Sequence, residues 1–188
     1  LPAALAPFLA AHPGVDVDLE ERPSYAIVRD VAAGRAEVGI VADTADPGSL
    51  QHFAFATDRL VVVVPAFHRL ARRREAAFSA LIGEPFVGLD EGSALQDHLA
   101  EHAALLGGQL AYRARVRSFD AVCRLVEGGI GIAVVSEVAA RRCQAAMKIR
   151  IVRLSDGWAL RRLQICVRDL AALAGPARQL VDALRRAP

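Results

Sequence analysis

The chain has 188 residues, which allows one domain or two closely joined lobes. Apolar residues make up 54% and the mean hydropathy is +0.29, yet no uncharged apolar run approaches the roughly 20 residues of a membrane-spanning helix. The net charge of +2, from 23 basic and 21 acidic residues, is far from the excess of a dedicated nucleic-acid binder. We therefore expect a soluble chain that contacts no membrane.

The spacing of cysteines and arginines indicates the cellular compartment and how the basic residues are exposed. The three cysteines, Cys123, Cys143 and Cys166, are widely spaced and form no CxxC pair. This pattern suits a reducing compartment, so the sequence predicts a cytoplasmic protein, with Cys123 and Cys166 buried. Basic clusters at 72–74, 141–142, 161–162 and 185–186 have no interleaved aromatic residues, so we expect them to be solvated faces.

Helix and strand patterns alternate from the start of the chain. Apolar residues recur at helical spacing over 1–9 until His12-Pro13-Gly14, and residues 15–19 then alternate apolar with acidic, as a half-buried strand does. Ser24 is placed to cap a helix that Gly34 closes, and a buried strand is predicted over 38–41. After a turn at 46–48, the β-branched run over 60–64 predicts a further buried strand.

The second half continues the alternation. Strands are predicted over 86–89, 112–116 and 130–135, separated by helices over 94–106 and 119–127. This order predicts a largely parallel sheet with helices on its faces. Two more strands, over 151–154 and 163–167, precede a closing amphipathic helix.

One motif points to a zinc hydrolase. His98, Glu101 and His102 match HxxEH, in which two histidines on one helix face hold zinc and the glutamate activates water. The pattern is short and no third ligand is marked, so an exposed helix face is the favoured interpretation. No nucleophile elbow or phosphate-binding loop is present, and we expect no catalytic residue, no metal ion and no cofactor.

Three serines form the most informative pattern. Ser24, Ser93 and Ser118 each precede a helix, and Ser93 with Gln96 has the spacing of a capping box. In a parallel sheet such junctions fall at the carboxyl ends of the strands, where ligands bind and helix N-termini present free N–H groups. The sequence therefore predicts a small-molecule site that prefers an anion or a carboxylate.

Several phrases, in this order, resemble the effector-binding domain of LysR-type transcriptional regulators. They are "LPAALAPFLAAHPGVDVDLEE", "VAAGRAEVGIV", "DRLVVVVPAFHRLA", "GEPFVGLDEGSALQDHL" and "RSFDAVCRLVEGGIGIAVVSEVAA", which together cover nearly the whole chain. The resemblance implies an α/β fold of the type-2 periplasmic-binding-protein class: two Rossmann-like lobes joined by two crossover strands, at 60–64 and 151–154. Lobe I would be 1–62 with 152–188, and lobe II 63–151.

The resemblance also implies a function and a site. The chain would be the effector-sensing and oligomerising domain of a transcriptional regulator, a homodimer or homotetramer that binds a small metabolite between its lobes. The metabolite would be contacted by Ser24, Ala42, Asp43, Gly92, Ser93, Ser118 and Phe119. DNA would be bound only through an N-terminal helix-turn-helix domain that is absent from this chain.

Two departures and one alternative accompany this interpretation. The family's first strand and polar turn have no counterpart before residue 1, and the cysteine pair of the peroxide-sensing branch is absent from 83–106. Asp43 would repel a carboxylate effector unless an arginine offsets it, which makes the predicted anion preference moderate. A solute-binding protein of a transporter is the alternative function, with the zinc hydrolase behind it.

Overall fold

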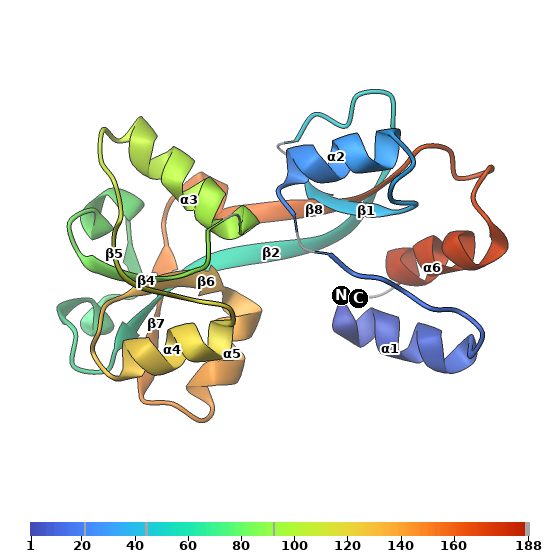
Figure 1. Ribbon diagram of the computed structural model, residues 1–188. Coiled ribbons are helices and arrows are strands. Elements are labelled where there is room, and N and C mark those ends of the chain that lie inside the picture. Colours follow the sequence, from blue (N-terminus) through green and yellow to red (C-terminus); the bar gives the residue numbers. More distant parts are fainter. Residues whose placement is uncertain (21, 44, 92, 187–188) are drawn as a thin grey trace. The chain divides into compact units, whose positions relative to one another are not determined.

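The computed structural model describes residues 1–20, 22–43, 45–91 and 93–186. The chain forms two compact units: unit 1 comprises Leu1–Thr57 and Arg162–Pro188, and unit 2 comprises Asp58–Arg161. The chain passes between them in strands β2 (Gln51–Pro65) and β8 (Leu160–Val167) (Figure 1). The crossover predicted at 151–154 is misplaced, because those residues belong to β7 (Ile149–Leu154), whose apolar side chains are buried in unit 2.

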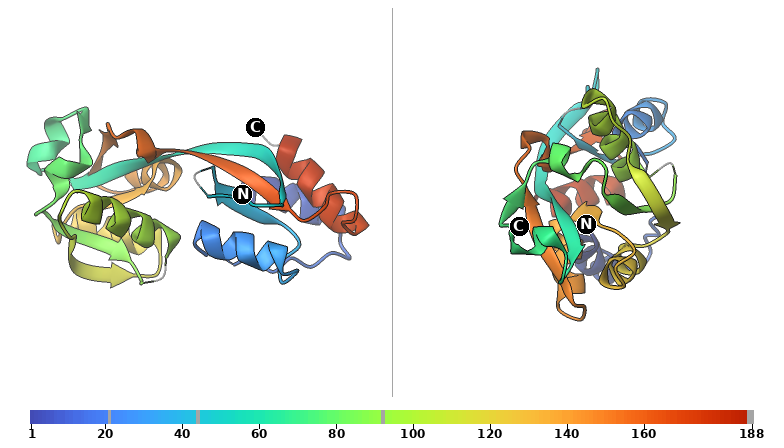
Figure 2. Two further views of the ribbon diagram at one scale, coloured as in Figure 1. Left: turned by 90° about the horizontal axis from the view of Figure 1, so that it is seen from above. Right: turned by 90° about the vertical axis from the view of Figure 1, so that its left-hand side faces the viewer.

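Unit 1 is built on an antiparallel strand pair. Strand β1 (Gly39–Ala42) pairs with β8, with Gly39 opposite Cys166 and Ala42 opposite Leu163. Helix α2 (Ser24–Ala32) packs on β1, and α1 (Pro2–Ala11) lies beside α6 (Gly175–Arg186), as Figures 1 and 2 show. The apolar face of α2 is buried against one side of the β1–β8 pair, and the apolar face of α6 is buried against the other side.

Two predictions in unit 1 are wrong. Residues 15–19 form no strand, since their backbone joins no ladder among the described residues. Ser24 does not cap α2, because Pro23 occupies the N-cap position and Ser24 is the first helical residue. Gly34 does close the helix in a left-handed conformation, with φ +75°.

Unit 2 is a sheet with helices on both sides. Strand β2 pairs with β6 (Ala133–Ser136) and β7, and β4 (Pro85–Leu89) pairs with β5 (Ala111–Val116). Helix α3 (Ala94–Leu105) covers one face, and α4 (Phe119–Glu127) with α5 (Glu137–Gln144) covers the other (Figure 1). Short elements complete the unit: η1 (Arg69–Arg72), β3 (Glu75–Ala76), η2 (Phe78–Leu81) and η3 (Gly157–Ala159).

Residues 60–64 of β2 contribute buried side chains to both faces of the unit 2 sheet. Leu60, Val62 and Val64 enter the core beneath α3, whereas Val61 and Val63 enter the core beneath α4 and α5. All five are at most 2% exposed, which is why this part of β2 has no polar alternation.

The predicted largely parallel sheet is only partly correct. β4–β5 and β3–β7 are parallel, but β2 runs antiparallel to both β6 and β7, and β1 runs antiparallel to β8. Helix α5 was missed, because its polar sequence has no apolar stripe beyond Ala139, Ala140 and Cys143.

The prediction made for the cysteines is confirmed. All three cysteines are buried, as predicted for Cys123 and Cys166, and burial raises the pKa of Cys123 to about 12. Within the described ranges, no helix combines the length and apolar character needed to cross a bilayer.

Candidate ligand-binding site

The site begins at the carboxyl edge of two parallel strands in unit 2. In the β4–β5 pair Leu89 stands opposite Val116, and the Asp90 N–H donates to the Val116 carbonyl at 3.1 Å. Because the two strands end together, the loops before α3 and α4 leave the sheet at one edge. Ser93 and Ser118 are therefore brought to the same edge, as predicted. Gly92, a predicted contact in the first of these loops, lies outside the described residues.

Helix α4 begins with a complete cap. Ser118 is its N-cap, with extended backbone, and its Oγ accepts a hydrogen bond from the Ala121 N–H at 3.2 Å. Asp120 adds negative charge in the first turn, where the helix dipole favours it. One of the first-turn N–H groups of α4 is thus satisfied by the side chain of its own N-cap residue.

Helix α3 begins differently although its sequence matches the capping-box pattern. Ser93 is the N-cap, but its side chain makes no capping hydrogen bond. Ser93 Oγ and Gln96 Oε1 are both buried and have no hydrogen-bond partner among the described residues. Gln96 is only 5% exposed, so water does not replace the missing partner freely. Neither side-chain hydrogen bond of a capping box is formed, and we call this arrangement the open capping box.

A third unpartnered polar atom comes from β5. The hydroxyl of Tyr112 is buried and has no partner in the described part of the chain, and burial raises the pKa of its phenol. Gly88 on β4 brings Tyr112 and Gln96 together: a Cβ at residue 88 would lie 2.5 Å from Tyr112 Cε1 and 2.6 Å from Gln96 Oε1. Only glycine leaves room for both side chains.

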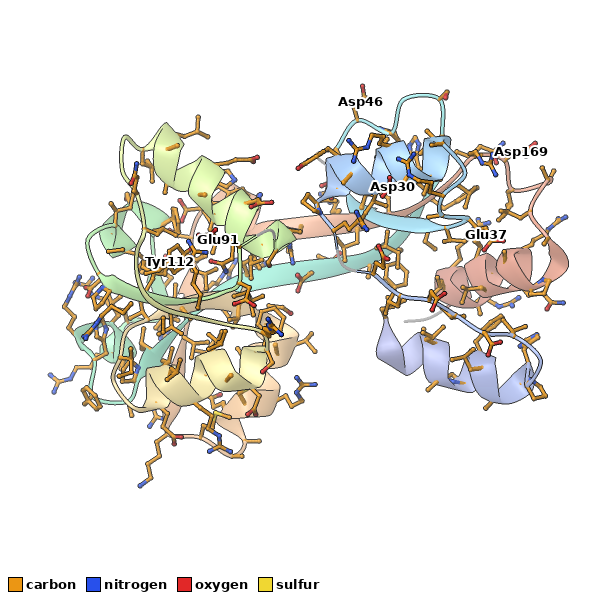
Figure 3. All side chains as sticks on the ribbon, in the orientation of Figure 1. Asp30, Glu37, Asp46, Glu91, Tyr112 and Asp169 are labelled. Carbon is orange, nitrogen blue, oxygen red and sulfur yellow. The ribbon has the colours of Figure 1, made fainter. Side chains whose placement is uncertain are left out.

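Charged side chains of both signs border these atoms. The Arg115 guanidinium lies over the Tyr112 ring, 4.0 Å from its centroid, and 3.8 Å from Glu91. Figure 3 shows Tyr112 and Glu91 in unit 2. Arg117 donates to Asp90 at 3.1 Å on the exposed rim. Because each arginine is paired with a carboxylate, the border itself carries no excess of positive charge.

This arrangement has a defined hydrogen-bonding capacity. Gln96 Oε1 accepts, while the Ser93 and Tyr112 hydroxyls donate or accept. The first-turn N–H groups of α3 add donors at the positive end of the helix dipole. A ligand that offers a hydroxyl to Gln96 and an oxyanion to the hydroxyls and N–H groups would satisfy the set. Unpaired buried polar atoms each cost about 1–3 kcal/mol, so such a ligand would stabilise the fold.

The predicted residues of unit 1 are also placed. Ser24 Oγ accepts from the Ala42 N–H at 3.2 Å, which joins the start of α2 to the end of β1 and brings these two predicted contacts together. Asp43 is exposed, and its N–H donates to the Arg162 carbonyl at 2.8 Å. In unit 2, the predicted contact Phe119 is half-buried and packs on the cores of both faces, so its ring is a packing element.

The expectation that the HxxEH histidines lie on an exposed helix face is wrong, because both are partly buried and form an aromatic cluster with Trp158. The His102 ring stacks on Trp158, with centroids 4.1 Å apart and planes 10° apart, and His98 packs edge-on against both rings. Burial, together with His102 and Arg161, lowers the pKa of His98 to about 4. The described residues contain no group of three or more His, Cys, Asp or Glu side chains placed to hold a metal ion.

Gln96, Tyr112 and Gly88 were not predicted as site residues. Gly88 carried a usable signal, since a glycine inside an apolar strand marks a close approach. Tyr112 carried none, because its place beside Gln96 depends on the parallel pairing of β4 with β5.

Comparison with known proteins supplies the family. The model of the LysR substrate binding domain matches residues 1–188. An uncharacterized HTH-type transcriptional regulator of Methanocaldococcus jannaschii is 26% identical over 159 residues, which are 83% of this chain and 53% of that protein. The chain spans about half the length of the curated relatives it matches.

Solved structures show the same fold. The regulatory domain of CcmR from Synechocystis PCC6803, in complex with 2-PG, has a TM-score of 0.77 at 22% identity, covering 98% of this chain and 88% of that one. The BenM effector binding domain with its effector benzoate has a TM-score of 0.71 at 22% identity, covering 99% and 84%. The predicted class, an α/β fold like the type-2 periplasmic-binding proteins, is confirmed.

Proposed function

The chain belongs to the LysR substrate binding domain family, and from this premise we propose that it is the effector-sensing, oligomerising domain of a cytoplasmic LysR-type transcriptional regulator. A small molecule binds the domain, changes the relative population of its conformations, and thereby alters DNA binding by an N-terminal helix-turn-helix domain. The domain binds without catalysing a reaction. Units 1 and 2 correspond to lobes I and II.

The open capping box of α3 is the observation that carries this proposal. Three buried polar atoms, Ser93 Oγ, Gln96 Oε1 and Tyr112 OH, have no hydrogen-bond partner among the described residues. Ser93 lies at the edge where ligands of parallel α/β units bind, and Gly88 brings the side chains of Gln96 and Tyr112 together. A ligand that bonds to these atoms removes the cost of burying them unpaired. Ser24, Ala42 and Asp43 of unit 1, and Gly92, Ser118 and Phe119 of unit 2, remain proposed contacts.

The relatives indicate a class of ligand. The two solved structures pair their proteins with 2-PG and with benzoate. We expect a small organic anion here too, and the acceptor Gln96 Oε1 favours one that also carries a hydroxyl. The carboxylates Asp90 and Glu91, which pair with Arg117 and Arg115, limit how much charge the ligand carries.

Thermal unfolding across a panel of small anions tests the proposal. The panel contains benzoate, 2-PG and a series of hydroxycarboxylates. A ligand at 100 times its Kd should stabilise the chain by about 2.7 kcal/mol, a shift of several degrees in Tm. Ser93→Ala should reduce that shift, while the exposed control Ser155→Ala should leave it unchanged. A shift that Ser93→Ala and Gln96→Leu both leave intact would place the ligand elsewhere.

A further inference from the structure

Charge is divided unequally between the two units. Unit 2 holds 15 of the 23 basic and 11 of the 21 acidic residues, a net charge of +4, and unit 1 holds 8 basic and 10 acidic residues, a net charge of −2. The small net charge of the whole chain therefore conceals a clearly basic unit 2. Where the excess basic residues lie within unit 2 indicates which kind of partner they can bind.

Six basic residues gather at one edge of the unit 2 sheet, which we name the β7 edge patch. Strand β3 pairs in parallel with β7, with Glu75 beside Arg153, and the Arg153 N–H donates to the Arg74 carbonyl at 3.1 Å. Element η1 packs on β7, the strand that is labelled in Figure 1. All members of the patch are exposed: Arg72, Arg73, Arg74, Lys148, Arg150 and Arg153.

The patch lacks compensation. Among the described residues, none of its six cations lies within 4.0 Å of a carboxylate oxygen, although ten other arginines do. Arg69, also in η1, is excluded from the patch because Glu84 pairs with it. The neighbouring acids are Glu75, which is exposed, and Glu127, which pairs with Arg124 and accepts from the Lys148 N–H.

The shape of the patch suits an extended anion. Arg150 and Arg153 lie three residues apart on β7, so their side chains leave opposite faces and the positive charge wraps the sheet edge. Arginine is the side chain best matched to phosphate, because its planar donors bind two oxygens at once. Phe67, which follows β2, is a single exposed ring, whereas proteins that bind unpaired bases stack successive bases on several aromatic rings.

We propose that the β7 edge patch binds the phosphate backbone of duplex DNA without regard to sequence. The proposal rests on the proposed function, since a domain joined to a helix-turn-helix module works beside DNA. The patch adds a second, electrostatic contact to the one made by that module. The Arg72–Arg74 run was expected from sequence to be a solvated face, and only the β3–β7 pairing reveals the cations from β7 beside it.

Fluorescence anisotropy of a labelled 20-base-pair duplex of arbitrary sequence, titrated with this chain between about 25 and 150 mM salt, tests the proposal. We expect measurable binding at the lowest salt, and a loss of at least tenfold in affinity on replacing Arg72, Arg73 and Arg74 by Gln. The slope of log affinity against log salt should fall by about 0.9 for each phosphate that the variant no longer neutralises. The charge-matched control replaces the exposed Arg168, Arg178 and Arg186 of unit 1 by Gln and should change affinity less than twofold.

Three outcomes overturn the proposal: no binding at the lowest salt, an equal loss in the control variant, or polyglutamate of matched charge displacing the duplex at equal concentration, which would indicate an acidic protein partner. Circular dichroism checks that each variant is folded. The thermal shift with small anions is measured on the same variants. A patch variant that loses DNA but keeps the ligand shift supports the patch; a wild type that binds DNA but shows no ligand shift contradicts the proposed function alone.

Discussion

Helices α3 and α4 start from the same edge of unit 2, each directly after a serine, but only one of the two serines makes a capping hydrogen bond. At α4 the Ser118 side chain accepts from the Ala121 N–H, and the cap is complete. At α3 the Ser93 side chain makes no such bond, and Gln96 is buried beside it without a partner among the described residues. The Ser118 oxygen is thus already engaged in capping and can contribute less to a ligand, whereas the Ser93 hydroxyl makes no such bond.

The largest effect on this contrast should come from Gly88→Ala. The new Cβ would overlap Tyr112 and Gln96, at 2.5 and 2.6 Å, so both side chains must move. We expect a loss of about 1–3 kcal/mol in the free energy of unfolding, together with loss of ligand binding. Urea unfolding measures the first and the anion thermal shift the second.

Gly157→Ala is the matched control, since nothing lies within 4 Å of a Cβ there. It should change stability by less than about 0.5 kcal/mol. Equal losses in the two variants would mean that the tight approach at Gly88 has no special role.

A further prediction concerns His98, another residue of α3, and the pH dependence of the free energy of unfolding. The pKa of His98 is near 6.5 in the unfolded chain and about 4 in the folded one, so the unfolded state binds more protons between these values. The free energy of unfolding should therefore fall as the pH falls from about 6.5 to about 4, by on the order of 1–2 kcal/mol through this group.

His98→Gln should remove that part of the pH dependence, as urea unfolding at pH 5 and 7.5 would show. The exposed His52 provides the control, and His52→Gln should leave the dependence unchanged. The charged groups that act on His98 are His102 and Arg161, and Glu101 and Asp156 act in turn on His102. If His98→Gln keeps the full wild-type dependence, these groups, and not His98, determine it.

Gln96→Leu should separate stability from binding. Replacing an unpartnered buried amide by an apolar side chain of similar size leaves the ligand-free chain as stable as before, or more stable by up to about 1 kcal/mol. The same change should weaken ligand affinity at least tenfold, measured by calorimetry. A ligand-free chain destabilised by more than about 2 kcal/mol would show that Gln96 makes an important structural contact.

The sequence predicted the serines but not which cap forms. Ser93 with Gln96 fits the capping box, yet the spacing does not determine the backbone before the helix, and Ser93 has φ −70° where Ser118 has φ −142°. Likewise, the helix–strand alternation predicted the β4–β5 pair but not the antiparallel return of β2. The local sequence pattern predicted the helices and strands. The side chains that lie beside Tyr112 and Gly88 are determined by contacts between residues distant in sequence, which the pattern does not show.

The most direct test compares Ser93→Ala with Ser118→Ala by thermal unfolding without ligand and with a saturating anion. Removing the Ser118 cap should cost about 1 kcal/mol without ligand and leave most of the ligand-induced shift in Tm. Removing the Ser93 hydroxyl should leave the ligand-free Tm nearly unchanged and reduce the ligand-induced shift. Equal destabilisation of the ligand-free chain by both variants, with the ligand-induced shift intact in both, would contradict the distinction between an open and a closed helix start.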